Sequence, residues 1–494
     1  MSLKRQFLWS MSPMLVVSVV NIFSVPFFVR HLGPEMYALW FYVITFSGMF
    51  GFSDLGIGSA VGRYIGVALG KGDHQAVREY WGTGNLIALP LLAVSATLFA
   101  ILGVWFGPKW FNVSPEHVGL LRGCFVAGGF GLFLNFYAQL WSYLSQAHLD
   151  FKYASVVRMA STLIQLLPSI AIAWVTPNPF WIICWGVVVS VAQLVVMVAY
   201  ARRRYGTGFE FGAARMARAR EMASFTAKTF ATLVAGSFLA SIDRVVLGKY
   251  ASSTEFTHYT VSGNVGMRLQ SLGSAVMGPV FHNTSRAVGQ GKQSSAAAIF
   301  DEMFFFMFGW YLLAAIWAAV WHPVLLRLWL GQDLGAQIAP LFPPLVLAYC
   351  ITAMGGISSV QLAPMNQVGV GLCFNIATGL LTAAGVWFGW RMGGLEGAVY
   401  GFLASRVVFI LQDLYVIRLV NARGWLASQV WRQIAAQGLV GALFSTAYLF
   451  AAKDSYWLLI LAALHGSCVA AWLLRVYLRR YLWTSRPANL AETP

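Results

Sequence analysis

Long apolar stretches follow one another along almost the whole chain, and short polar or glycine-containing segments separate them. Most hold about 20 or more residues, the length that an α-helix needs to cross a bilayer. They are too long and too uniformly apolar for the strands of a membrane barrel. Lipid offers the backbone no hydrogen-bond partners, so the spanning segments must be helices. The pattern therefore predicts an all-α integral membrane protein.

The same pattern predicts about fourteen transmembrane helices, which we group as two six-helix lobes and two C-terminal helices. Glycine, serine and alanine within the spans favour close helix–helix packing. The expected limits are 7–30, 37–62, 80–107, 118–147, 153–175, 180–200, 224–249, 257–282, 298–322, 339–363, 368–391, 394–421, 433–452 and 455–478.

Composition supports a membrane protein. Hydrophobic residues make up 59% of the 494 residues, charged residues make up 10%, and the mean hydropathy is +0.67. A soluble domain of this length cannot bury that much apolar surface.

The basic residues orient the spans. With the N-terminus in the cytoplasm, 23 of the 33 Lys and Arg residues fall on the cytoplasmic side, seven on the opposite side and three within spans. This bias follows the positive-inside rule, and an even number of spans returns the C-terminus to the cytoplasm. We expect a multi-pass protein of the cell inner membrane. Anionic membrane lipids then account for the net charge of +16, and no nucleic acid is needed as a partner.

Signals for catalysis and for metal binding are weak. The five cysteines all fall within predicted spans, without the spacing of a disulfide framework or a metal site. The chain has no phosphate-binding P-loop, and its histidines are scattered. We expect no catalytic residues, no metal and no cofactor, hence a protein that is not an enzyme.

The chain divides into two halves around its longest loop, the basic segment 201–223. We predict an N-lobe at 1–200, a cytoplasmic linker at 201–223, a C-lobe at 224–421 and a C-terminal part at 422–494. A weak repeat supports this division, because Gly70 and Gly72 recur 219 residues later as Gly289 and Gly291. The repeated segments are separated by an even number of spans, so the two halves have the same orientation in the membrane. An axis along the membrane normal therefore relates them.

Several segments resemble those of one family of transporters. RHLGPEMYALW from Arg30 is similar to a signature of polysaccharide translocases, with Ala38 in place of the usual glycine. Further segments that resemble the family's blocks are SDLGIGSAVGRY from Ser53, ASIDRVVLGKY from Ala240, RLWLGQDLGAQIAPLF from Arg327 and MGGLEGAVYGF from Met392. The resemblance covers residues 1–420. It implies the multidrug/oligosaccharidyl-lipid/polysaccharide (MOP) exporter superfamily, in its O-antigen flippase-like branch, with two lobes that open alternately to each side.

Arginines within the spans are candidates for binding substrate, because an ionisable group inside a membrane usually faces a cavity or a partner. Arg268 and Arg406 lie near the middle of their spans, and Arg122 lies nearer the outer end of its span. The guanidinium fork suits a diphosphate. The alternative is that each arginine pairs with a nearby carboxylate or carbonyl, and Arg122 can also extend to the surface.

Asn21 and Gln139 add hydrogen-bonding groups within spans, and Trp141 and Tyr143 near Gln139 offer aromatic faces to a sugar. Buried amides also join membrane helices to one another, and that interpretation stays open.

Two acidic residues within spans are candidates for ion coupling. Asp54 and Asp243 can bind a proton, or a cation such as Na⁺, if burial disfavours the free carboxylate. Asp54 can instead pair with Arg63, and Asp243 can be a structural contact. Asp243 and Arg244 are sequence neighbours on different faces of a helix, so we do not expect them to satisfy each other.

We therefore expect a flippase that moves an isoprenoid-diphosphate-linked oligosaccharide or polysaccharide precursor to the outer leaflet by alternating access. Its expected partners are that glycan, membrane lipids and other proteins of polysaccharide assembly. Two alternatives stay open. A cation-coupled exporter of small molecules requires a compact acidic site, and a membrane glycan polymerase or ligase requires catalytic residues on a long outer loop.

Overall fold

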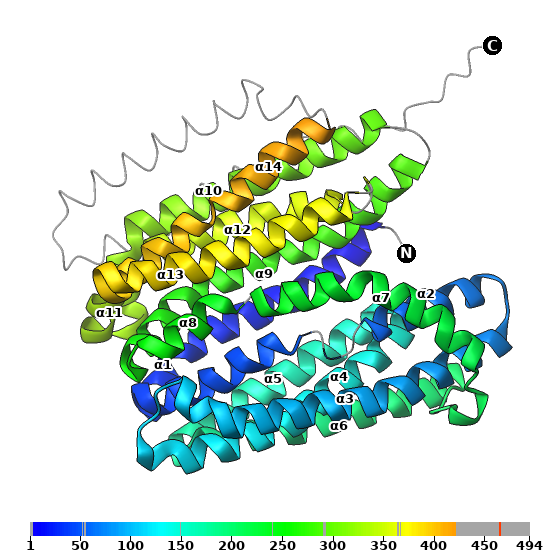
Figure 1. Ribbon diagram of the computed structural model, residues 1–494, viewed down its shortest axis with the longest axis horizontal. Coiled ribbons are helices and arrows are strands. Elements are labelled where there is room, and N and C mark those ends of the chain that lie inside the picture. The colour runs from blue at the N-terminus through cyan, green and yellow to red at the C-terminus, as the bar shows by residue number, and fades with distance from the viewer. Residues whose placement is uncertain are drawn as a thin grey trace. The chain divides into compact units, whose positions relative to one another are not determined.

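The computed structural model describes residues 3–420, apart from positions 52, 54, 55, 149, 240, 290–292, 363, 364 and 366, together with residues 464 and 465. The regular secondary structure of these residues is entirely helical (Figure 1), which confirms the all-α class. The helices are α1 Leu3–Met49, α2 Ile57–Gly70, α3 His74–Trp110, η1 Pro115–His117, α4 Val118–Ala147, α5 Phe151–Val175, α6 Pro179–Tyr205, η2 Phe211–Ala213, α7 Met216–Leu239, α8 Ile242–Tyr250, α9 Ser253–Gly289, α10 Gln293–Leu330, α11 Gln332–Ile338, α12 Phe342–Leu362, α13 Val368–Ser405 and α14 Val407–Val420.

Within the described part of the chain, eight helical segments are long and apolar enough to cross a membrane. One of them, Gly369–Val420, covers two expected spans. The expected spans 433–452 and 455–478 lie outside the described residues. The eight segments are Val16–Met49, His74–Trp110, Pro115–Ala147, Lys152–Val175, Pro179–Tyr205, Met307–Leu330, Phe342–Leu362 and Gly369–Val420.

Glycines bend the helices near boundaries that the sequence predicts. Gly33 bends α1 with φ 75°, a conformation that glycine adopts without the strain of a β-carbon. Gly393 and Gly394 bend α13 between the expected spans 368–391 and 394–421. The expected span 37–62 is interrupted, because α1 ends at Met49 and α2 begins only at Ile57.

The chain divides into two compact units, and each is described separately. The first unit comprises Met1–Asn264 and Gly369–Ser405, and the second comprises Val265–Val368 and Arg406–Pro494. The predicted lobes at 1–200 and 224–421 stay a prediction.

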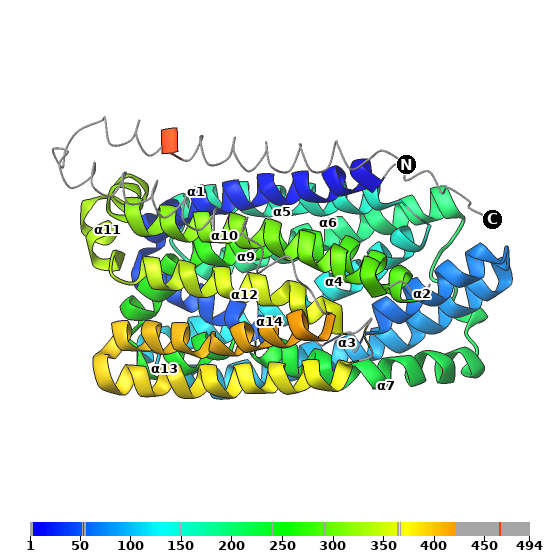
Figure 2. The same cartoon turned by 90° about the horizontal axis from the view of Figure 1, so that it is seen from above.

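In the first unit, α3, α4 and α6 pack closely side by side (Figures 1 and 2). An apolar core joins α2, α3 and α4 around Trp81 and Trp141, whose rings meet edge to face with centroids 4.8 Å apart. Both tryptophans are almost fully buried, so each removes a large apolar area from water or lipid headgroups.

The connection between α6 and α7, here named the linker strap (residues 206–215), folds onto α3. The Trp81 indole donates to the Gly208 carbonyl at 2.6 Å, and the Arg215 amide donates to the Thr83 hydroxyl at 3.0 Å. Between these bonds the strap passes so near α3 that a β-carbon on Gly82 would lie 2.0 Å from the Glu210 carbonyl oxygen. Most of the predicted linker 201–223 is thus ordered structure: the end of α6, the strap and the start of α7.

The two arms of α13 in the first unit also pack at backbone distance. A β-carbon on Gly389 would meet the Gly397 carbonyl oxygen at 2.0 Å, and one on Gly401 would meet that of Gly385 at 1.9 Å. Two small-xxx-small pairs therefore face each other, the arrangement by which membrane helices approach most closely.

In the second unit, α12 packs between α10 and α14, and α12 and α14 run side by side (Figure 2). Phe409 of α14 lies directly on Gly355 of α12, where a β-carbon would come within 2.3 Å of the ring. Tyr311 of α10 donates a hydrogen bond to the Leu269 carbonyl of α9 at 2.9 Å.

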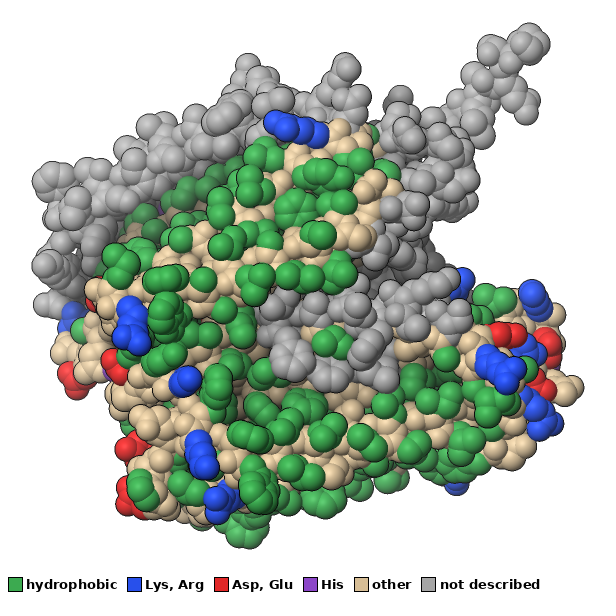
Figure 3. Space-filling view, in the orientation of Figure 1, with side chains coloured by type: hydrophobic (Ala, Val, Ile, Leu, Met, Phe, Trp, Pro, Cys, Tyr) green, Lys and Arg blue, Asp and Glu red, His purple; other side chains and the backbone are tan. Residues whose placement is uncertain are grey.

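On the face shown in Figure 3, hydrophobic side chains cover the lengths of the helices, and charged side chains gather toward the helix ends. A cluster of Lys, Arg, Asp and Glu lies at the end of the first unit where α2 and the start of α7 meet. This distribution matches an apolar band with polar ends, as a membrane protein requires.

Candidate functional site

Arg406 lies at a break in the expected span 394–421, between the end of α13 at Ser405 and the start of α14 at Val407. The residue is only 6% exposed. Its Nη1 donates to the Thr352 hydroxyl of α12 at 3.3 Å, and its guanidinium carbon stands 5.5 Å from the centre of the Phe409 ring. The hydroxyl accepts one hydrogen bond from the planar guanidinium, and the aromatic ring lies at cation–π distance.

Arg268 lies in the middle of α9 and is half-buried. One turn later, the Ser271 hydroxyl donates back to the Arg268 carbonyl at 2.8 Å. The structure places both Arg268 and Arg406 in the second unit.

The other predicted substrate-binding residues belong to the first unit. Arg122 is exposed, one turn into α4, and Gln139 is half-buried farther along the same helix. The Asn21 amide donates to the Val17 carbonyl at 2.8 Å within its own helix α1. Roles in substrate binding stay predictions for all three.

Asp243 is buried in the first turn of α8, where the helix dipole favours a carboxylate. The Tyr259 hydroxyl of α9 donates to its Oδ2 at 2.7 Å. Arg244 Nε lies 3.9 Å from the same oxygen, at the limit of an ion pair, so the two neighbours do contact each other, against our expectation. Through these contacts Asp243 joins α8 to α9. Asp54, the other acidic candidate, lies outside the described residues.

A buried polar cluster that the sequence-based predictions do not include lies between α12 and α14. Asp413 is 6% exposed, and the Ser358 hydroxyl donates to its Oδ1 at 2.5 Å. The neighbouring Gln412 amide donates to the Gly355 carbonyl at 2.9 Å and to the Ser359 hydroxyl at 2.7 Å. The signal was available, since an acidic residue in the apolar run VVFILQDLYVIRLV obeys the same rule that singled out Arg406.

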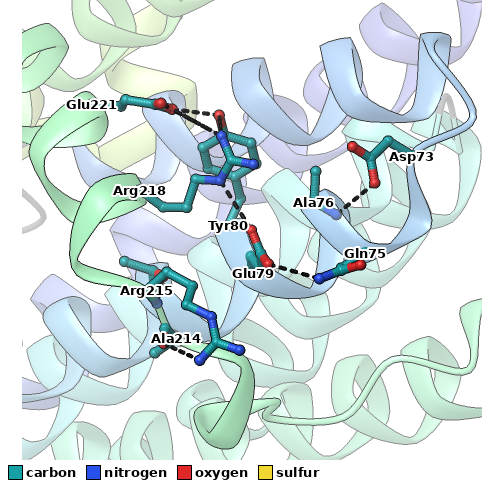
Figure 4. A network of polar contacts seen from close by, with 10 residues as sticks. Asp73, Gln75, Ala76, Glu79, Tyr80, Ala214, Arg215, Arg218 and Glu221 are labelled. Carbon is teal, nitrogen blue, oxygen red and sulfur yellow. Dashed lines mark hydrogen bonds and ion pairs between the residues drawn. The ribbon is translucent and has the colours of Figure 1, made fainter.

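A second polar network ties the start of α7 to α3 at the charged end of the first unit (Figure 4). Arg218 donates from Nε to Glu79 at 3.1 Å and from Nη1 to the Tyr80 hydroxyl at 3.0 Å. The Tyr80 hydroxyl in turn donates to Glu221 at 2.5 Å. The hydrogen bond to Glu79 is the main cause that raises the pKa of Arg218. This network adds contacts between α7 and α3 next to the hydrogen bonds that join the strap to α3.

One group of side chains on the first unit has the donor types of a metal site. Glu35, Glu116 and His117 bring three ligand atoms within 4.8 Å of one another, and the His117 ring nitrogen lies 3.1 Å from Glu35. Both glutamates are exposed, so a surface ion pair explains the group as well.

Comparison with known proteins gives a family and a fold. The sequence model of the polysaccharide biosynthesis protein family matches residues 3–284. No curated protein matches the chain.

Solved structures with a similar fold are transporters and a flippase. The lipid II flippase MurJ in an inward closed conformation has a TM-score of 0.66 at 12% identity, over 95% of this chain and 100% of that chain. An inward-facing multidrug resistance MATE family transporter of the MOP superfamily has a TM-score of 0.64 at 13% identity, over 84% of this chain and 98% of that chain. A MOP superfamily transporter from Pyrococcus furiosus has a TM-score of 0.60 at 14% identity, over 85% of this chain and 96% of that chain.

Proposed function

Because this chain belongs to the polysaccharide biosynthesis protein family, within the MOP exporter superfamily, we propose that it is a flippase for an isoprenoid-diphosphate-linked oligosaccharide or polysaccharide precursor. The flippase moves the precursor from the cytoplasmic to the outer leaflet of the cell inner membrane, with both termini in the cytoplasm. The structural neighbours support the fold of a transporter, and the family supports a glycan substrate.

Arg406 is the observation that carries the proposal. A guanidinium that is 6% exposed inside an apolar span is costly, and such groups in membrane proteins are usually functional. Its planar donors fit the two phosphates of the carrier lipid. Because Arg406 is covered in the described state, we propose that it contacts the diphosphate when the helices around it part during the transport cycle.

Arg268 is proposed as the second diphosphate ligand, since it lies in the same unit and at mid-span. Arg122, Gln139 and Asn21 are proposed to contact the sugars, which are rich in hydroxyl groups. We also propose that transport is coupled to H⁺ or Na⁺. Of the two acidic residues that the sequence suggests for ion coupling, Asp243 lies among the described residues, and the Tyr259 hydroxyl donates a hydrogen bond to its carboxylate.

Display of the glycan on living cells tests the proposal. Arg406→Ala and Arg268→Ala together should lose most display at a normal membrane level of the protein. Arg406→Lys should keep part of it, because lysine retains the charge and loses the fork. Arg418→Ala is the matched control, since Arg418 is exposed in the last turn of α14. Normal display by the double variant at normal expression would reject the cationic anchor.

A further inference from the structure

Asp413 is enclosed by two tightly packed helices of the second unit. Phe409 of α14, one turn before Asp413, packs directly on Gly355 of α12. Asp413 itself is 6% exposed. The Ser358 hydroxyl donates to one carboxyl oxygen at 2.5 Å. One neutral donor offsets only part of the free energy that an ionised carboxylate loses when it leaves water.

Uncharged amides and hydroxyls occupy the described turns of α12 and α14 around Ser358 and Asp413. Gln412 uses its amide nitrogen on the Gly355 carbonyl and the Ser359 hydroxyl. Gln361 lies one turn after Ser358 on α12 and is fully buried, and both atoms of its amide have no hydrogen-bond partner among the described residues. Most buried polar groups in native proteins have a hydrogen-bond partner, so this region of α12 is more polar than its bonding requires.

Several titratable groups lie on the described helices that pack around Asp413. Within the described residues no ion pair involves Asp413. Arg406, just before α14 begins, directs its Nη1 to Thr352. The other titratable groups are Tyr349 and Cys350 on α12, Tyr415 and Arg418 on α14, and Asp301, Glu302, Tyr311, His322 and Arg327 on α10.

We propose that Asp413 is a proton-binding site, with the Ser358 hydroxyl as its hydrogen-bond donor. The carboxyl is neutral while α12 and α14 are closed on it, and it loses its proton to water when they part. The step moves one proton between water and a carboxylate oxygen, and no other bond changes. Proton binding therefore favours the closed α12–α14 pair.

A proton is a better ligand here than a metal ion. A metal cation needs several oxygen donors around it. Among the described residues, Asp413 has one hydroxyl at hydrogen-bond distance, and the Gln412 amide is already bonded elsewhere. Protonation needs no further ligand, because it removes the charge itself. The consequence for transport rests on the proposed flippase function, while the proton site does not.

Infrared titration of the purified protein in nanodiscs tests the site without any substrate. At a pH where exposed carboxylates are ionised, the wild type should show the carbonyl band of a protonated carboxylic acid, and this band should disappear when the pH is raised further. Asp413→Asn should lack this band, and Asp73→Asn, which changes an exposed helix cap, should keep it. Ser358→Ala should keep the band to higher pH, because the lost hydroxyl stabilised the carboxylate. This second variant tests the site even if Asp413→Asn does not fold.

Three results would overturn the proposal. They are identical titrations for the wild type and Asp413→Asn, a Ser358→Ala band that titrates like the wild type, and a band that Na⁺ removes at constant pH. A transport assay across the same pH range separates the two proposals. Asp413→Asn should transport with a flattened pH profile, whereas a wild type that moves no glycan at any pH rejects the flippase function and leaves the infrared result valid.

Discussion

Replacing Gly82 with alanine should release the linker strap from α3. A β-carbon at this position lies 2.0 Å from the Glu210 carbonyl oxygen and 3.0 Å from its carbon, and both are backbone atoms that cannot rotate away. Real β-carbon contacts do not fall below 3.0 Å, so the strap must move by about 1 Å or more. Such a shift stretches the flanking hydrogen bonds, Trp81 to Gly208 and Arg215 to Thr83.

The cost follows from those two bonds. Each contributes about 1 kcal/mol net, and a buried indole N–H left without an acceptor costs a further ~1 kcal/mol. The free energy of local opening of the strap should therefore be roughly 2–3 kcal/mol lower in Gly82→Ala than in the wild type. This difference raises the equilibrium constant for opening ~30- to 150-fold. The global fold should persist, because the strap is a surface segment of the first unit.

Hydrogen exchange followed by mass spectrometry measures this opening. Peptides that cover 206–216 should exchange faster in Gly82→Ala, while peptides from the middle of α4 should not change. Gly66→Ala is the matched control, because a β-carbon there has no neighbour within 4 Å and favours the helix. Wild-type exchange of the strap in Gly82→Ala would refute the close approach of strap and α3.

Three further predictions concern packing and charge. Gly389→Leu should separate the two arms of α13 at a cost of about 3 kcal/mol in stability, and this should lower the melting temperature of the detergent-purified protein. Gly369→Leu, with open space around it, should not lower it, and equal melting temperatures of the two variants would contradict the packing. Arg218→Ala and Glu79→Gln should be coupled by about 1 kcal/mol in a double-mutant cycle, less at high salt, and additive effects would show that their 3.1 Å contact contributes nothing. Burial lowers the pKa of His148, so the unfolded chain binds more protons than the folded chain, and stability should fall as pH drops below about 6.5. His148→Phe keeps the ring stack on Tyr205 and should flatten the dependence of melting temperature on pH between pH 8 and 5; an unchanged dependence would contradict this role of His148.

Apolar stretches and glycines were enough to predict much of the fold. The bends at Gly33 and Gly394 lie near predicted boundaries, because a long apolar helix ends or turns where a residue without a side chain permits it. The break in α13–α14 at Arg406 was missed, since no glycine or proline marks it. The same holds for the path of the strap, which depends on a contact between Gly82 and a carbonyl 128 residues away.

The candidate site was only partly predictable. Arg268 and Arg406 stand out in the sequence because charge is rare inside spans. Whether such a charge is covered or paired depends on neighbouring helices, as the Thr352 contact of Arg406 and the Tyr259 contact of Asp243 illustrate. Asp413 shows the same limit, since its importance depends on Ser358, 55 residues earlier on another helix.

Translocation by the purified protein tests the flippase proposal most directly. The protein is reconstituted in liposomes whose outer leaflet carries a fluorescent isoprenoid-diphosphate-linked sugar, and a membrane-impermeant quencher reports how much label crosses. The wild type should protect a growing fraction of the label, Arg418→Ala should match it, and Arg406→Ala should lose most of the protection. Equal protection by liposomes with the wild type, with Arg406→Ala and without protein would contradict the account.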